Sequence, residues 1–144
     1  MSIVSTIKSN PNLKKFVHWM LIPRHQARPR TWVKWFVNPF IHKKGKGASI
    51  RYRTRIDVLP FNKFELGSNS TIEDFCTVNN GVGDVIIGSG VRIGMSNVVI
   101  GPVQVGNNVI FAQNIVISGL NHGYEDINTP ICKQPTSTAK IIVE

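Results

Sequence analysis

Hydrophobic residues return at every sixth position through most of the second half of the chain. The residues at these positions are Leu66, Ile72, Val78, Ile87, Ile93, Val99, Val105, Phe111 and Ile117. Every step is six residues except the step from Val78 to Ile87, which is nine. An antiparallel sandwich would instead alternate with a period of two. The period of six predicts short parallel strands stacked in coils, with about three hexads to a coil and about three coils in all.

A second position in each hexad supports the same arrangement. The residue four places after the hydrophobic start is mostly aliphatic or small, which suits an inner corner of a coil. These residues are Ser70, Cys76, Val82, Val91, Asn97, Val103, Val109 and Ile115. Gly, Asn and Asp fill the turns between them, and Gly and Asn tolerate the positive φ of a sharp bend.

The segment before the repeat has a different pattern. From Ile50 to Val58, apolar and polar residues alternate strictly, with Arg51, Arg53 and Arg55 among the polar ones. A period of two over nine residues predicts one β-strand with a polar face.

The first part of the chain favours helix. Its spacing predicts a helix that Pro23 ends. The apolar face would hold Leu13, Phe16, Val17, Met20 and Leu21, and the opposite face Lys14, Lys15 and His18. A short apolar cluster follows at residues 32–37, and residues 43–47 read as a basic, flexible linker. We therefore divide the chain into a helical, aromatic-rich N-terminal segment, residues 1–48, and a repeat body, residues 49–144.

Charge separates the two parts further. The chain carries a net charge of +9. Residues 1–63 hold fourteen Lys or Arg and one acid, whereas residues 64–144 hold three Lys or Arg and seven acids. The basic segment fits a cap packed on the body or on a neighbouring subunit, or a helix lying on an anionic membrane. Nucleic acid is the least expected partner, because no known binding motif accompanies the charge.

The hexads resemble those of the hexapeptide-repeat acyltransferases. The resemblance covers about residues 50–144 and is strongest at residues 87–94 (IGSGVRIG) and 105–109 (VGNNV). It implies a mainly β fold, a left-handed parallel β-helix, preceded here by the short basic helical segment. Relatives of this type continue with further hexads that supply most of the coenzyme A groove, so we expect more coils to follow Glu144.

The repeat stops after Ile117, and residues 118–139 are expected to leave the stack as a protruding loop. His122 in this loop is the only histidine of the body. In the sugar O-acetyltransferase branch that the sequence resembles, a histidine in an Asn-His context is the catalytic base. A sugar hydroxyl needs such a base, because it is a poor nucleophile at neutral pH. A solvated loop histidine is the alternative interpretation.

Other polar residues could assist His122. Glu125 or Asp126 could orient the imidazole, unless these acids are merely solvated. Asn121, next to the base, is a candidate for substrate binding. Asn79 and Asn80 lie at the nine-residue step, near the point where similar enzymes hold the acceptor hydroxyl with an asparagine. Both could instead be turn residues at a bulge.

The sequence thus predicts transfer of an acetyl group from acetyl-CoA to a sugar hydroxyl on a glycan precursor, without an acyl-enzyme. The resemblance implies a homotrimer with active sites between subunits. No metal is expected, because a zinc site of three histidines cannot form from one. A cytoplasmic protein with possible peripheral membrane contact is expected, since the sequence has no signal peptide or long apolar run. The alternative is a non-catalytic β-helix scaffold that binds membrane or nucleic acid through its basic segment.

Overall fold

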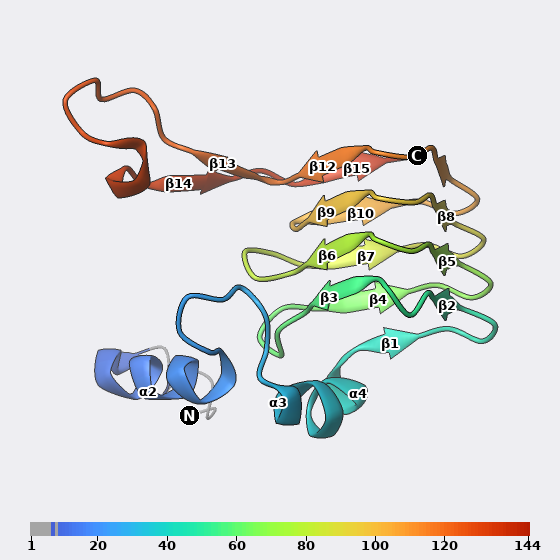
Figure 1. Cartoon of the computed structure of the whole chain (residues 1–144), viewed down its shortest axis with the longest axis horizontal. Coiled ribbons are helices and arrows are strands. Elements are labelled where there is room, and N and C mark those ends of the chain that lie inside the picture. Colours follow the sequence, from blue (N-terminus) through green and yellow to red (C-terminus); the bar gives the residue numbers. More distant parts are fainter. Residues whose placement is uncertain (1–6, 8) are drawn as a thin grey trace.

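Stacked parallel strands form the body of the protein in a computed structural model, which describes residue 7 and residues 9–144 (Figure 1). Four complete coils each give one strand to each of three parallel sheets, as expected for a mainly β solenoid. The first sheet contains β1 (Lys43–Lys44), β4 (Phe64–Leu66), β7 (Val85–Ile87), β10 (Val103–Val105) and β15 (Ile141–Val143). The second contains β2 (Ser49–Ile50), β5 (Thr71–Ile72), β8 (Arg92–Ile93) and β11 (Ile110–Phe111). The third contains β3 (Arg55–Asp57), β6 (Thr77–Asn79), β9 (Val98–Ile100) and β12 (Val116–Ser118).

The predicted hexad starts form the core of the solenoid. They lie directly above one another in the sheets: Leu66 pairs with Ile87, Ile72 with Ile93, and Val78 with Val99. Each of these side chains is at most 2% exposed. The second predicted inward position is also confirmed at Ser70, Cys76, Val91, Asn97 and Val103, but not at Val82. That residue is exposed because the nine-residue step places Val85 in the core instead.

The predicted strand over residues 50–58 is wrong. A turn over residues 51–54 divides it into β2 and β3, which pair with the next coil. Ile50 and Ile56 are themselves six residues apart and take the hexad positions of an additional first coil. The alternation was misleading because it continues without interruption across the corner between β2 and β3. The predicted linker is wrong as well, because β1 already pairs with β4.

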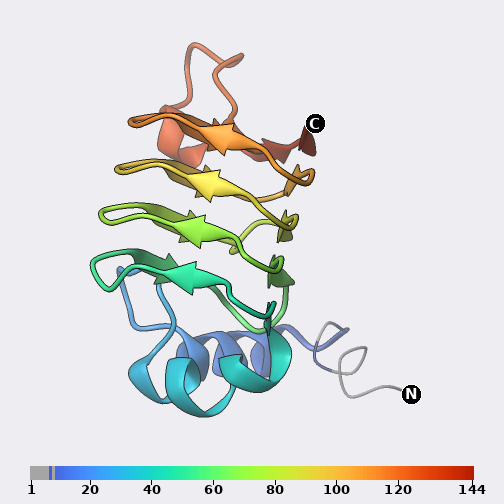
Figure 2. The same ribbon diagram turned by 90° about the vertical axis from the view of Figure 1, so that its right-hand side faces the viewer.

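Helices close one end of the solenoid (Figure 2). They are α2 (Pro11–Leu21), α3 (Thr31–Phe36) and α4 (Asn38–Ile41). Val33 is fully buried, and the Asn38 side chain donates a hydrogen bond to the Val58 carbonyl at 2.9 Å. These contacts cover the first coil. Within residue 7 and residues 9–144, no helix has the length and apolarity needed to cross a bilayer.

The predicted helix is confirmed, but its predicted faces are partly wrong. The side chain of Asn10 accepts hydrogen bonds from the Asn12 and Leu13 amides and so caps the start of α2. Phe16 and Met20 lie on the solvent side. His18, expected to face away from the body, stacks on Phe61 of the first coil at 5.4 Å between ring centroids. The ring of a histidine can pack as an apolar surface, which simple polarity patterns do not register.

His42 is half-buried between α4 and the first sheet, where it lines a hollow of about 990 Å³. Both ring nitrogens are inaccessible and have no partner among the described residues. Three lysines, Lys34, Lys43 and Lys44, and one acid, Glu65, line the same hollow. Burial lowers the pKa of the His42 imidazole below its ordinary value of 6.5, because the charged form loses its hydration.

This pKa predicts a loss of stability in mild acid. As the pH falls below about 6.5, the unfolded chain binds a proton at His42 before the native protein does. The stability contributed by neutral His42 is then lost progressively as the pH falls through the lowered native pKa. One proton limits the slope to about 1.4 kcal/mol per pH unit, and partial exposure of the ring reduces it further. Urea unfolding from neutral to mildly acidic pH should show this slope in the native protein and a smaller one in His42→Gln. Equal slopes would contradict the prediction.

Candidate active site

One corner of the solenoid holds all the residues predicted to act in catalysis. The other two corners have four residues in every coil, for example residues 67–70 and 73–76 in the second coil. At the corner between the third and first sheets the length varies. The connecting segments there are residues 58–63, 80–84, 101–102 and 119–140. Because these segments stack on one another along the left side of Figure 1, we call this edge the variable corner.

The last of these segments is partly a β-hairpin. The sequence predicted an irregular loop over residues 118–139, but β13 (Leu120–His122) pairs antiparallel with β14 (Thr136–Thr138). The stem is attached firmly, since the Gly119 amide donates to the Ile100 carbonyl and the Ile141 amide to that of Pro102. Gly119 is required here, because a Cβ would lie 2.7 Å from the Pro102 carbonyl oxygen. The chain therefore leaves and re-enters the stack at one fixed point.

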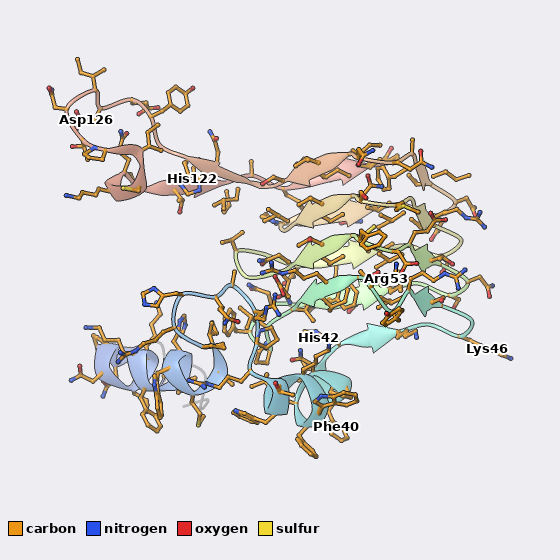
Figure 3. All side chains as sticks on the ribbon, viewed as in Figure 1. Phe40, His42, Lys46, Arg53, His122 and Asp126 are labelled. Atoms are coloured by element: carbon orange, nitrogen blue, oxygen red, sulfur yellow. The ribbon has the colours of Figure 1, made fainter. Side chains whose placement is uncertain are left out.

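His122 lies at the far end of β13, on the hairpin that projects beyond the coils (Figure 3). It stands opposite Thr136 in the register. Its side chain is exposed, and no hydrogen bond or ion pair engages the imidazole within the described part of the chain. Both ring nitrogens are thus available to a substrate, while the paired backbone fixes the position of the residue.

Contacts within the tip order the rest of the projecting segment. The Gln134 side-chain amide donates to the carbonyls of Asp126 and Thr129, both at 2.8 Å, and accepts from the Asp126 amide at 3.2 Å. A short 3-10 helix, Ile131–Lys133, precedes Gln134. The Thr129 hydroxyl, hydrogen-bonded to the Asp126 carboxylate, lowers the pKa of that carboxyl. These bonds make the tip a defined structure rather than a free loop.

Glu125 and Asn121 lie beside His122 in sequence, and both are exposed. In the described ranges no hydrogen bond or ion pair joins Glu125 to His122, so its orienting role remains a prediction. Asn121 pairs across the hairpin with Ser137. Adjacent residues of a strand point to opposite faces, so Asn121 faces away from the side that carries the imidazole. Its substrate-binding role also stays a prediction.

Asn79 and Asn80 occur at the same corner, two coils away from the hairpin. Asn80 is fully buried, and its amide bridges two coils. Its oxygen accepts from the Leu59 amide at 2.6 Å, and its nitrogen donates to the carbonyls of Leu59 and Asn62 at 3.0 and 2.8 Å. A substrate-binding role for Asn80 is not supported by this geometry, because no part of the amide is free. Asn79 is half-buried and accepts from the Gly81 amide at 2.6 Å, and its role remains a prediction.

Asn80 should therefore affect stability. Asn80→Ala leaves the buried Leu59 amide without a partner, so we expect the free energy of unfolding to fall by about 1–3 kcal/mol. Asn79→Ala is the control, since it removes one local hydrogen bond and should cost less than about 1 kcal/mol. Urea unfolding monitored by circular dichroism gives both values. Equal stability of the two variants would contradict a clamping role for Asn80.

Neither cysteine forms a hydrogen bond with His122 among the described residues. Cys76 is fully buried, and its thiol donates to the Gly94 carbonyl at 3.0 Å. Burial raises the pKa of this thiol, which disfavours the thiolate needed for nucleophilic attack. Cys132 is exposed in the hairpin tip. Among the residues that the structure describes, no three potential metal ligands gather.

The sequence prediction missed the partners that shape the site. Thr136 stands opposite His122, and Gln134 secures the tip. The β-branched Thr136 and Thr138 were a weak signal for β14, because three polar residues cannot be distinguished from loop. Nothing in the sequence marked Gln134, because its three bonds all go to backbone groups.

A known structure with this architecture is AntD, an N-acyltransferase from Bacillus cereus, solved as a variant in complex with dTDP and coenzyme A. The two structures superpose with a TM-score of 0.59 at 19% sequence identity. The match covers 77% of this chain and 59% of the AntD chain. No protein-family model matches the sequence, and no curated protein matches it. At this identity the likeness establishes the shared fold.

Proposed function

We propose that the protein transfers an acetyl group from acetyl-CoA to a sugar hydroxyl, with His122 as the general base. The observation that carries the proposal is the hairpin, which holds an exposed imidazole at a fixed place on a rigid scaffold, with no partner for it among residue 7 and residues 9–144. The hexad resemblance to acyltransferases supports it. So does the likeness to AntD, whose structure contains coenzyme A.

The proposed reaction is a direct transfer. The acceptor oxygen attacks the thioester carbonyl carbon while the neutral imidazole of His122 removes the hydroxyl proton. The C–O bond forms, the C–S bond breaks, and the imidazolium returns its proton to the departing thiolate. The products are the acetyl ester and coenzyme A. General base assistance contributes about 10²–10⁴-fold, and holding both substrates together contributes further.

Neighbouring residues would bind and orient the reactants. Asn79, at the same corner, is the proposed acceptor-binding residue, since Asn121 faces away from the side of the strand that carries the imidazole. Glu125 is the proposed orienting acid, which would need to turn toward the ring when substrates bind. Because acetyl-CoA is an intracellular metabolite, we place the reaction in the cytoplasm.

We propose that the active protein is a homotrimer in which each hairpin tip reaches a neighbouring subunit. The tip carries apolar side chains in solvent, with Ile127 94% exposed and Tyr124 and Ile131 more than half exposed. Exposed apolar groups of this kind are typical of contact surfaces. Native mass spectrometry tests the assembly, and Ile127→Ser should weaken it. A monomer at micromolar concentration would contradict the trimer.

Binding of acetyl-CoA to the full chain is the first test. A ligand at a hundredfold excess over its Kd stabilises the native state by about 2.7 kcal/mol, which a thermal shift detects. Calorimetry then gives the Kd, and desulfo-coenzyme A is a second probe of the same groove. No stabilisation by either would overturn the proposal and favour a non-catalytic scaffold.

The acceptor class needs a separate test. The dTDP bound to AntD makes nucleotide sugars a natural first panel, together with free sugars. Product mass spectrometry distinguishes acetylation of hydroxyl sugars from that of amino sugars. Acetylation of amino sugars alone would retain the acyltransferase and replace the hydroxyl acceptor by an amine.

A further inference from the structure

The end of the solenoid covered by helices carries a cluster of exposed apolar side chains. On α2, α3 and α4 these are Trp19, Trp32, Trp35, Phe36, Phe40 and Ile41, which we call the cap face. Phe40 is 87% and Phe36 74% exposed. Figures 1 and 2 both show the three helices at the end of the stack opposite the hairpin, and in Figure 1 α2 lies to the side of α3 and α4. The cap face is therefore separate from the candidate active site.

Arg30 joins the two parts of the cap face. Its guanidinium donates two hydrogen bonds to the Trp19 carbonyl, both at 3.1 Å, and lies 5.6 Å from the centre of the Trp19 ring. Because Arg30 also precedes α3, it holds the end of α2 against the start of α3. Phe16 packs beside Trp19 at 5.9 Å. The exposed aromatic side chains thus occupy connected elements.

The charge around the cap face has one sign. No acidic residue precedes Asp57 in the sequence. Exposed cations on the helices and the segments joining them include Lys14, Lys15, Arg24, Arg28 and Lys34. None of these five forms an ion pair within the described residues. A second copy of the same face would be repelled, so the complementary partner is anionic.

We propose that the cap face docks on the surface of an anionic lipid bilayer. Trp and Phe favour the interface between headgroups and acyl chains, while Lys and Arg attract anionic headgroups. Ile41 favours a lipid surface over a nucleic acid as the partner, because an aliphatic side chain offers no plane for base stacking. The inference stands apart from the proposed acyl transfer, since it uses the opposite end of the molecule.

The chain contains its own reporter for this contact. Its three tryptophans, Trp19, Trp32 and Trp35, all belong to the cap face. Docking should shift tryptophan emission to shorter wavelength with vesicles of phosphatidylcholine and phosphatidylglycerol. Vesicles of phosphatidylcholine alone should give a much smaller shift. Raising the salt from about 0.1 M to about 1 M shortens the screening length from about 10 Å to about 3 Å and should weaken binding.

Two matched pairs of variants test the apolar and the electrostatic contributions to vesicle binding separately. Phe40→Ser removes an aromatic group from the cap face, and Tyr52→Ser removes one that is equally exposed, at 88%, on the solenoid wall. Phe40→Ser should weaken vesicle binding at least about tenfold. Lys34→Glu should weaken it about thirtyfold, because two charge units are changed. Tyr52→Ser and Lys133→Glu, in the hairpin tip, should bind like the unaltered chain. Circular dichroism confirms that all four variants fold.

The proposal would be overturned if the full chain failed to sediment with anionic vesicles. It would also be overturned if Phe40→Ser bound them as well as Tyr52→Ser. Tighter binding to single-stranded nucleic acid than to vesicles would assign the face to that partner instead. Self-association that Phe40→Ser abolishes would assign it to a second copy. Binding of acetyl-CoA is unaffected by any of these outcomes, so failure here is distinguishable from failure of the proposed function.

Discussion

His122→Ala should lower the rate of acetyl transfer by about 10²–10⁴-fold, the usual contribution of a general base. The imidazole is the only group on the hairpin stem that can accept a proton at neutral pH. Removing it leaves the substrates bound but the hydroxyl unactivated, so the loss should appear in kcat more than in KM. The fold should be unaffected, because the side chain is exposed and makes no hydrogen bond within the described residues.

Acetyl-CoA and the best acceptor of the sugar panel provide the assay, with product measured by mass spectrometry. His122→Gln, which keeps a polar side chain, should be as impaired as His122→Ala. His25→Ala is the control, since it removes another exposed imidazole in the N-terminal segment. Full activity of either His122 variant would exclude the residue as base.

Ile93→Ala should produce the largest loss of stability, about 2–5 kcal/mol. Ile93 is fully buried in the second sheet, between Ile72 of one coil and Phe111 of the next. Truncation leaves a cavity that the stacked coils cannot close, because strand pairing fixes their spacing on both sides. The loss is a large part of the 5–15 kcal/mol that stabilises a typical domain.

A matched control is available on the same sheet. Ile110 lies on the neighbouring strand but points outward and is 74% exposed. Ile110→Ala deletes the same atoms and should change stability by no more than about 0.5 kcal/mol. In thermal unfolding, the Tm of Ile93→Ala should be lower by roughly 10 °C, whereas the Tm of Ile110→Ala should be nearly unchanged. Similar losses in both variants would contradict the inward direction of the hexad position.

The solenoid was predictable because the position of a residue within its hexad determines whether its side chain faces inward. A hexad start faces inward whatever the coil, so Leu66, Ile72 and Val78 could be placed from spacing alone. The first coil was missed because its six-residue step from Ile50 to Ile56 is hidden within an alternation of two. The His18–Phe61 stack was also inaccessible to periodicity, since it depends on how α2 meets a distant corner.

The candidate site was predictable in part. The end of the repeat correctly located the protruding segment and its histidine. The hairpin within that segment was not foreseen, because its strands are three residues long and separated by 13 others. The asparagine pair shows a second limit: sequence could not tell the buried Asn80 from its half-buried neighbour Asn79. The difference arises from the first coil, whose Leu59 and Asn62 enclose the Asn80 amide.

The variable corner accommodates segments of different length, whereas the other two corners keep four residues in every coil. After a connection of 22 residues, the chain re-enters the first sheet with Ile141 opposite Val103. One coil earlier, a connection of two residues places Val103 opposite Val85 in the same register. The register of the strands is therefore independent of the length and sequence of an insertion at this edge. Residues 119–140 could be exchanged as a cassette with the hydrophobic interior untouched, and under the proposed function such an exchange would change the acceptor preference. A transplanted hairpin should retain the stability of its host.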